Sequence, residues 1–219
     1  MIVTIDGPAG SGKSTAAKGV AARLGFDFLD TGAMYRAVAL RCLEAGIDLS
    51  DVEAAATIAR RTDIQALGNR VLADGADVTE AIRRAQVAQA ASVVAVNPQV
   101  RAALVALQRK AATGRNIVTE GRDQGTVVFP DAECKFYITA APEERARRRR
   151  EEMAAQGSHA SFDETLREIR ERDARDKSRD VAPLKQADDA IRVDTTGQSA
   201  EDVLNFLVQT IRERTPRDK

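Results

Sequence analysis

The feature that most constrains this chain is a glycine-rich segment at residues 7–15, close to the N-terminus. Its sequence, Gly-Pro-Ala-Gly-Ser-Gly-Lys-Ser-Thr, fits the phosphate-binding loop pattern G-x-x-x-x-G-K-[ST]. Residues 2–5 before it form a β-branched run typical of a buried strand. Residues 16–24 after it are rich in alanine, and Gly25 is a helix stop signal. A strand, this loop and a helix in that order indicate a site for nucleotide phosphates rather than a chance glycine turn.

The residues of this P-loop have distinct expected roles. The glycines let the backbone curl until several N–H groups point at one anion, and the following helix adds the positive end of its dipole. Lys13 is expected to reach the β- and γ-phosphates of ATP, and Ser14 to ligate Mg²⁺. The predicted ATP-binding residues of the loop are Gly7, Pro8, Ala9, Gly10, Ser11, Gly12, Lys13, Ser14 and Thr15.

Short apolar strands alternate with helices along the rest of the chain, a pattern typical of a parallel sheet with helices on both faces. The predicted strands cover residues 2–5, 26–29, 116–119, 135–139 and 190–193. Residues 63–79 break the pattern, because three short runs separated by two turns predict a small antiparallel meander. We therefore expect an α/β, three-layer fold of the P-loop NTPase type, with a parallel five-stranded sheet and a small antiparallel insert.

The composition limits the classes of function. The 33 basic and 33 acidic residues give zero net charge, which argues against a basic nucleic-acid-binding domain. Cys42 and Cys134 lie far apart without metal-ligand spacing, so we expect two buried thiols rather than a disulfide or a zinc site. We see neither a long apolar run nor a secretory signal, and so expect no membrane partner and a cytoplasmic location.

Two segments that follow predicted strands can hold a second substrate. Residues 30–36, Asp-Thr-Gly-Ala-Met-Tyr-Arg, place a hydroxyl, a phenol and a guanidinium on one turn of a helix. The alternative is a structural role, with Thr31 as the helix N-cap. In residues 120–125, Glu-Gly-Arg-Asp-Gln-Gly, Arg122 can reach a phosphate and Asp123 can accept a hydrogen bond from the amino group of a base. The alternative there is a plain glycine turn.

A charged helix is the third candidate. Ser161 and Glu164 predict its N-terminus, and helical geometry puts Arg172, Asp176 and Arg179 on one arc, together with Arg175. Three guanidinium groups in such an arrangement suit planar recognition of phosphates. The alternative is a solvated face with internal ion pairs.

Together these segments resemble the bacterial cytidylate kinases, nucleoside monophosphate kinases that act on CMP and dCMP. The resemblance covers almost the whole chain and rests on four motifs: I-D-G-P-A-G-S-G-K-S-T, D-T-G-A-M-Y-R, E-G-R-D-Q-G-T-V-V-F-P-D-A and R-D-A-R-D-K-S-R-D-V-A-P-L. One departure is Thr31, where serine is frequent in such enzymes, and it keeps the hydroxyl group.

The resemblance implies a phosphoryl transfer from ATP to CMP or dCMP, with Mg²⁺ as cofactor. It implies a CMP site made of Thr31, Arg36, Ser92, Arg101, Arg122, Asp123, Arg172, Asp176 and Arg179. The implied catalytic residues are Lys13, Arg122, Arg172 and Arg175. The arginines at 145 and 147–150 look like a lid that closes over ATP, with Arg148 as an ATP-binding residue. Ser92 and Arg101 have weak local signals, and each can equally be an ordinary helix-surface residue.

The implied organisation is a single monomeric domain over residues 1–219. Its parts are a core at 1–36, 90–140 and 180–219, an NMP-binding region with the β insert at about 37–89, and a helical lid at about 142–178.

Three rival functions remain open from the sequence. The nearest is a P-loop kinase for UMP or another small phosphate acceptor. A nucleotide-dependent switch is disfavoured because the chain has no N-K-x-D sequence, which reads the base in GTPase switches. A nucleic-acid-binding ATPase is disfavoured because two tyrosines and no tryptophan offer little stacking surface. We therefore expect nucleotides, and no nucleic acid, as partners.

Overall fold

The computed structural model describes residues 1–155, 160–179 and 181–214. His159, which we expect from the sequence in a surface loop, lies outside this part of the chain. The sequence also predicts a frayed end at residues 214–219, of which Arg214 is the last residue of a helix and 215–219 lie outside the described residues. The chain forms two compact units. The first unit consists of Met1–Phe26 and the described residues from Val118 onward, and the second of Asp27–Ile117.

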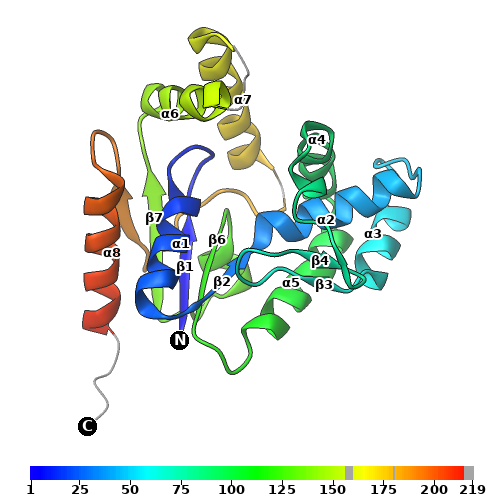
Figure 1. Cartoon of the computed structure of the whole chain (residues 1–219), viewed down its shortest axis with the longest axis horizontal. Coiled ribbons are helices and arrows are strands. Elements are labelled where there is room, and N and C mark those ends of the chain that lie inside the picture. Colours follow the sequence, from blue (N-terminus) through cyan, green and yellow to red (C-terminus); the bar gives the residue numbers. More distant parts are fainter. Residues whose placement is uncertain (156–159, 180, 215–219) are drawn as a thin grey trace. The chain divides into compact units, whose positions relative to one another are not determined.

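A five-stranded parallel sheet is present, as predicted, in the order β2-β6-β1-β7-β8 (Figure 1). Its strands are β1 (Ile2–Asp6), β2 (Asp27–Asp30), β6 (Ile117–Gly121), β7 (Cys134–Thr139) and β8 (Ile191–Asp194). Every strand begins and ends within two residues of its predicted position. The β-branched and aromatic side chains that predicted these strands fill the core, since Ile5, Phe136 and Ile138 are almost wholly buried.

The strand order explains why the P-loop lies where it does. β1 is the middle strand, with β6 on one side and β7 on the other, so the chain departs in opposite directions from this point. β1 and β7 run parallel, with Val3 opposite Cys134 and Asp6 opposite Tyr137. Open α/β sheets bind ligands at the carboxyl ends of the strands at such a switch point. The loop that follows Asp6 therefore lies at the edge where a ligand is expected.

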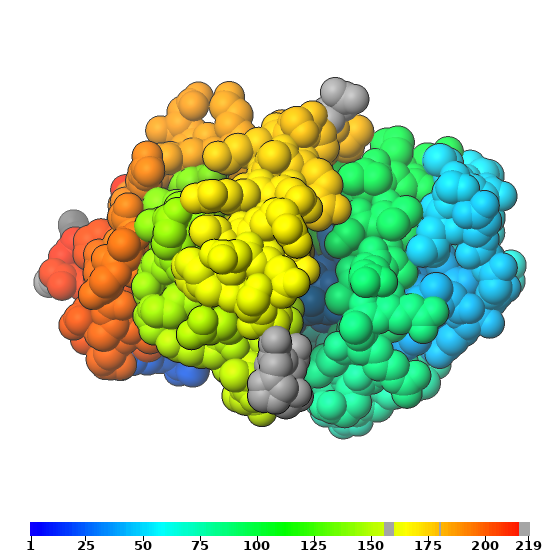
Figure 2. Space-filling view, turned by 90° about the horizontal axis from the view of Figure 1, so that it is seen from above, coloured from blue at the N-terminus to red at the C-terminus, as the bar shows by residue number. Residues whose placement is uncertain are grey.

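The first unit carries four α-helices and one turn of π-helix among its described residues: α1 (Lys13–Leu24), η2 (Gln124–Val128), α6 (Pro142–Ala155), α7 (Phe162–Ser178) and α8 (Ala200–Arg214). α1 packs against α8, and α6 packs against α7, which is visible where the yellow-green and yellow segments meet (Figure 2). The predicted capping box is confirmed at α7, where Ser161 accepts a hydrogen bond from the Glu164 N–H. α1 begins at Lys13 rather than at the predicted residue 16, because the P-loop runs directly into the helix.

The second unit carries α2 (Thr31–Glu44), α3 (Val52–Arg61), η1 (Ala81–Arg83), α4 (Ala85–Val94) and α5 (Pro98–Ala112). The predicted antiparallel meander is confirmed as β3 (Ile64–Gln65), β4 (Leu72–Ala73) and β5 (Ala76–Asp77). Asp30 caps α2, because its carboxylate accepts a hydrogen bond of 2.8 Å from the Ala33 N–H. Thr31, the alternative cap in the sequence, is instead the first helical residue.

Both cysteines are buried, as predicted, with Cys134 in the first unit and Cys42 in the second. Among the described helices, none is both long and apolar enough to cross a membrane by itself. The pair α4 and α5 meets the length and composition criteria only when taken together, and it is bent by 101° at its break.

Candidate active site

The P-loop backbone is built around glycines that no other residue can replace without strain. Gly10 and Gly12 have φ values of 72° and 85°, in the left-handed region that L side chains rarely adopt. At Gly7 a β-carbon would lie 2.0 Å from the carbonyl oxygen of Ile138, so the loop passes directly against β7. Gly12 is the N-cap of α1 and has no side chain to bond the first N–H groups of the helix. Those N–H groups and the helix dipole are the features that bind a phosphate.

Lys13 and Ser14 both face a buried carboxylate at the end of β6. The Lys13 ammonium lies 3.8 Å from Glu120 Oε2 and donates a hydrogen bond of 3.2 Å to the Pro8 carbonyl. The Ser14 hydroxyl donates a 2.9 Å hydrogen bond to Glu120 Oε1. Burial, the main cause, and the positive charge of Arg122 lower the pKa of Lys13 to about 8, and Glu120 partly opposes this effect. The sequence did not single out Glu120, although its place at the carboxyl end of a strand beside β1 was a usable signal.

Asp6 holds the turn that carries the Arg122–Asp123 pair. Its two carboxylate oxygens accept hydrogen bonds of 2.9 Å and 2.7 Å from the N–H groups of Gln124 and Gly125. A β-carbon at Gly125 would come within 3.4 Å of this carboxylate and 3.0 Å of the Thr4 hydroxyl, so the turn packs directly on β1. Burial raises the pKa of Asp6 to about 6, against the opposing effect of the two N–H groups. No local sequence pattern indicates this role for Asp6.

Arg122 and the charged helix meet in the first unit. The Arg122 guanidinium donates a 2.7 Å hydrogen bond to Asp176 and a longer one to its neighbour's carbonyl at Gly121. Arg179 lies 3.9 Å from the other oxygen of Asp176 and donates to the Ala182 carbonyl. Both arginine side chains are mostly buried, 17% and 13% exposed, rather than solvated.

The two predicted site arginines within α7, Arg172 and Arg175, lie in different surroundings. Desolvation, followed by repulsion from Arg122, lowers the pKa of Arg172, so Arg172 lies close enough to Arg122 to be repelled by it. Arg175 is exposed, and its Nε makes only a long hydrogen bond to the carbonyl of Glu171 one turn earlier. The structure therefore brings Arg122, Arg172, Asp176 and Arg179 together and leaves Arg175 at the surface.

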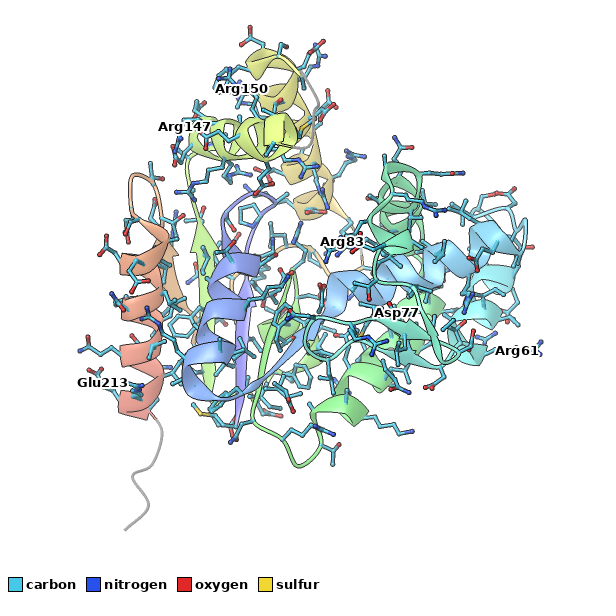
Figure 3. All side chains as sticks on the ribbon, viewed as in Figure 1. Arg61, Asp77, Arg83, Arg147, Arg150 and Glu213 are labelled. Carbon is cyan, nitrogen blue, oxygen red and sulfur yellow. The ribbon has the colours of Figure 1, made fainter. Side chains whose placement is uncertain are left out.

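The arginines of α6 fall into two groups. Arg147 pairs with Glu144 and Glu151, and Arg149 pairs with Glu152, so neighbouring acids neutralise the outer side of the helix. Figure 3 shows Arg147 and Arg150 on this outer side. Arg148 shares Glu144 with Arg147 but also bonds Thr195, and a β-carbon at Gly12 would lie 3.7 Å from its guanidinium. Arg148 is thus beside the P-loop.

Four of the predicted CMP-binding residues lie in the second unit. Thr31 is buried in the first turn of α2, and Arg36 on the same helix lies 3.8 Å from the carboxylate of Asp30, the N-cap of α2. The Arg101 guanidinium lies 5.9 Å from the ring centroid of Tyr35, within the range of a cation–π contact. Ser92 is exposed on α4, where its hydroxyl bonds a carbonyl of its own helix. Asp123, the remaining member, is buried in the first unit beside the turn held by Asp6.

Comparison with known proteins identifies the family. The sequence profile described as cytidylate kinase matches residues 3–213, nearly the whole chain. The chain belongs to the cytidylate kinase family. A cytidylate kinase of Caldanaerobacter subterraneus subsp. tengcongensis is 49% identical over 213 residues, covering 97% of this chain and 95% of that relative. A cytidylate kinase of Rhodopirellula baltica is 48% identical, covering 97% of this chain and 93% of the relative.

Solved structures resemble this cytidylate kinase family member in fold. TT1252 from Thermus thermophilus aligns with a TM-score of 0.51 at 18% identity, covering 99% of this chain and 98% of that one. An uncharacterized protein from Eubacterium ventriosum aligns with a TM-score of 0.55 at 11% identity, covering 97% and 98%. At these identities the likeness extends to the fold alone.

Proposed function

We propose that this member of the cytidylate kinase family transfers the γ-phosphoryl group of ATP to the phosphate of CMP or dCMP, giving ADP and CDP or dCDP. One observation in the first unit carries the proposal beyond family membership. Lys13 and Arg172 each lie close enough to Arg122 for its positive charge to lower their pKa, and Arg172 also lowers the pKa of Lys13. Cations held together against their repulsion favour a polyanionic ligand.

The donor would occupy the P-loop. The backbone N–H groups of residues 7–15 would hold the phosphates of ATP, and Lys13 would neutralise the charge that develops on the transferred group. Arg148 is close to the loop and would reach the same phosphates. Phosphoryl transfer has a loose transition state, so positioning and charge stabilisation supply most of the catalysis. The acceptor phosphate is already an anion, so no strong general base is needed.

The residues beside the P-loop fit a magnesium ion. The Ser14 hydroxyl and the Glu120 carboxylate lie 2.9 Å apart, and Mg²⁺ prefers such hard oxygen ligands, often with waters completing its octahedron. Ser14 and Glu120 would hold the ion, which when bound would offset the negative charge of the phosphates. Glu120→Gln should raise the Mg²⁺ concentration needed for half-maximal turnover by about tenfold, since it removes the negative charge of the carboxylate ligand. An unchanged Mg²⁺ dependence would contradict a role for Glu120.

The acceptor would be held by phosphate-binding arginines and base-reading carboxylates. Arg122, Arg172 and Arg179 present planar donors suited to the phosphate of CMP. The proposed catalytic residues are Lys13, Arg122, Arg172 and Arg175. Asp123 and Asp176 can accept hydrogen bonds from cytosine or ribose groups. The proposed acceptor residues of the second unit are Thr31, Arg36, Ser92 and Arg101.

The proposed organisation is one functional domain over residues 1–219. In it the NMP-binding region spans about 37–89 and the lid about 142–178, with the core formed by 1–36, 90–140 and 180–219. A monomeric state and a cytoplasmic location remain predictions.

A coupled assay of ADP release across the common nucleoside monophosphates tests the proposal. We expect kcat/KM for CMP and dCMP to exceed that for UMP by at least about tenfold, because a buried acceptor that pairs with the cytosine amino group is left unsatisfied by uracil. Equal kcat/KM values for UMP and CMP would contradict the predicted preference for cytosine and indicate a broader pyrimidine specificity. Absence of ADP release with every nucleoside monophosphate would contradict the kinase assignment itself.

A further inference from the structure

Arg145 differs from the other arginines of α6. Its side chain is only 3% exposed, whereas those of Arg147 and Arg149 are 52% and 54% exposed. It lies in the first turn of the helix, at the point where the chain leaves β7. A lid arginine that waits for a phosphate would keep its guanidinium accessible, so the burial of Arg145 indicates another task.

The guanidinium of Arg145 contacts three separate segments of the first unit. Its Nη1 donates a 3.1 Å hydrogen bond to the Ala9 carbonyl of the P-loop, and its Nε donates a 3.0 Å bond to the Ala140 carbonyl just after β7. Nη1 and Nη2 donate bonds of 3.0 Å and 2.6 Å to the two carboxylate oxygens of Asp173 on α7. Four of the five N–H donors of the side chain are thus engaged by the protein itself.

The P-loop also packs tightly on the same residue. A β-carbon at Gly10 would lie 3.3 Å from the β-carbon of Arg145. The loop therefore rests on the base of the Arg145 side chain at Gly10 and is bonded to its tip at Ala9.

Asp173, the partner carboxylate, stands among the acceptor residues of α7. Arg172 is its neighbour in sequence, and Asp176 lies three residues further, one helical turn away. A displacement of Asp173 along or about the helix axis would therefore move both of these side chains. Asp173 itself is 15% exposed and has both oxygens bonded by Arg145, so it is not available to a substrate in this arrangement.

We propose that Arg145 and Asp173 are positioning residues that hold the P-loop and the arginine helix α7 at a fixed separation. In this role neither side chain touches a substrate. The pair sets where Arg172 stands relative to Lys13, and so where an acceptor phosphate stands relative to the transferred group. The inference rests on the proposed phosphoryl transfer, whose rate depends steeply on such alignment.

The chemistry of the pair explains why these two residue types are needed. A planar guanidinium can bind both oxygens of a carboxylate and still direct its other donors to two carbonyls, whereas a lysine ammonium cannot reproduce this fork. A buried ion pair is a weak source of net stability, because desolvation opposes the attraction between the charges. The ion pair therefore contributes more to the placement of the P-loop and α7 than to the free energy of unfolding.

Asp173→Asn and Arg145→Lys test the inference with kinetic and equilibrium measurements on the full chain. We expect each variant to lower kcat/KM for CMP by about tenfold or more, while the Kd of ATP, measured by calorimetry, stays within about threefold of wild type. The double variant should fall no further than the more severe single variant, because both changes break one unit.

The exposed pair Glu143 and Arg170 is a matched control. It joins the same two helices at 2.8 Å, but its side chains are 55% and 60% exposed. Glu143→Gln should leave kcat, both KM values and the melting temperature nearly unchanged, because exposed ion pairs contribute little.

Four outcomes would overturn the inference. They are wild-type kinetics in folded Asp173→Asn, a lower melting temperature with unchanged kinetics, a rise in the ATP Kd that matches the loss in kcat/KM, and an equal effect of Glu143→Gln. If Asp173→Asn melts below the assay temperature, Asp173→Glu, which keeps the charge but shifts the carboxylate by one methylene, decides by the same criteria. CMP phosphorylation by the wild type is measured first, so failure of the proposed function is recognised separately.

Discussion

Lys13 carries its charge at a position where burial and two arginines disfavour it. Its pKa is lowered from 10.5 to about 8, chiefly by desolvation. Because the folded-state value is lower than the unfolded value, folding releases a proton in this range, and Lys13 makes the folded state more stable as the pH rises from about 8 to 10.5. Binding of ATP requires Lys13 to be protonated, because only the ammonium form attracts a phosphate.

We therefore predict that kcat/KM for ATP declines as the pH rises above about 8, which is the pKa of Lys13 in the enzyme without ligand. Steady-state kinetics from pH 6.5 to pH 10 at saturating CMP would measure the decline. Lys13→Arg should lose activity overall but show no decline near pH 8, because arginine stays protonated. A wild-type profile that is flat up to pH 10 would contradict the assignment of Lys13.

Arg172 offers a sharper test of phosphate binding than Arg179. The side chain of Arg179 is 13% exposed and bonded to Ala182, so a change there would disturb packing as well as charge. Arg172 exposes more of its surface than Arg179, although its surroundings still desolvate the guanidinium enough to lower its pKa. Arg172→Lys should raise the KM for CMP by about tenfold and leave the KM for ATP and the melting temperature nearly constant, because lysine lacks the planar fork. Arg170→Lys on the same helix is the control, and equal kinetics in both variants would indicate a merely solvated charged face.

At the scale of elements, the close passage of the P-loop over β7 depends on the absence of a side chain at Gly7. Gly7→Ala would bring a β-carbon to 2.0 Å from the Ile138 carbonyl oxygen, a clash with backbone that no rotamer can relieve. We expect it to lower the free energy of unfolding by at least about 3 kcal/mol, measured by urea titration. The control is Gly46→Ala, where φ is 63° but a β-carbon meets nothing within 4 Å, so only the conformational cost of about 1–2 kcal/mol applies. Equal losses in the two variants would contradict the steric argument.

The strands of the large sheet were predictable because each is a continuous β-branched or aromatic run that ends at a turn signal. The helices between residues 80 and 112 were less visible. α4 begins after Arg84, which makes no capping side-chain bond, and its alanine-rich sequence has little amphipathic contrast. α5 does carry a usable sequence signal, since Asn97 caps it and Pro98 occupies its first turn.

The turn of π-helix η2 illustrates what local sequence cannot predict. Residues 124–128 include three β-branched side chains in a row, a pattern that on its own favours a strand. The structure bends this segment into a helical turn because Asp6 captures the N–H groups of Gln124 and Gly125. A contact between residues so distant in sequence decides the local conformation here.

In the whole molecule, the candidate site also contains residues that local sequence identifies and residues that only long-range contacts reveal. Motifs identified the residues that would touch ligand, such as Lys13 and Arg122. They did not identify the residues that hold those groups in place, among them Asp6 and Asp173. The supporting residues act through long-range contacts that only the folded chain creates, and so spacing within one segment carries no sign of them.

The two buried thiols report on the integrity of the two units. Cys42 and Cys134 are fully buried, and burial raises the pKa of both, that of Cys134 to about 11, so little thiolate is present at pH 8. We expect a thiol reagent to modify the native protein at least about a hundredfold more slowly than the protein in denaturant, because modification must await local opening. In Cys42→Ala, the modification rate of Cys134 would measure the opening of the first unit. In Cys134→Ala, the modification rate of Cys42 would measure the opening of the second unit. Fast modification of both thiols in the native protein would contradict their burial.

The fit of Gly7 against β7 also has a genetic consequence. Every missense change that one nucleotide can make in a glycine codon introduces a β-carbon, and at this position each of them meets the carbonyl oxygen of Ile138. In a saturation library selected for growth on the encoded activity, codon 7 should therefore retain only synonymous changes. Codon 46, whose glycine faces open space, should accept alanine and asparagine among the survivors.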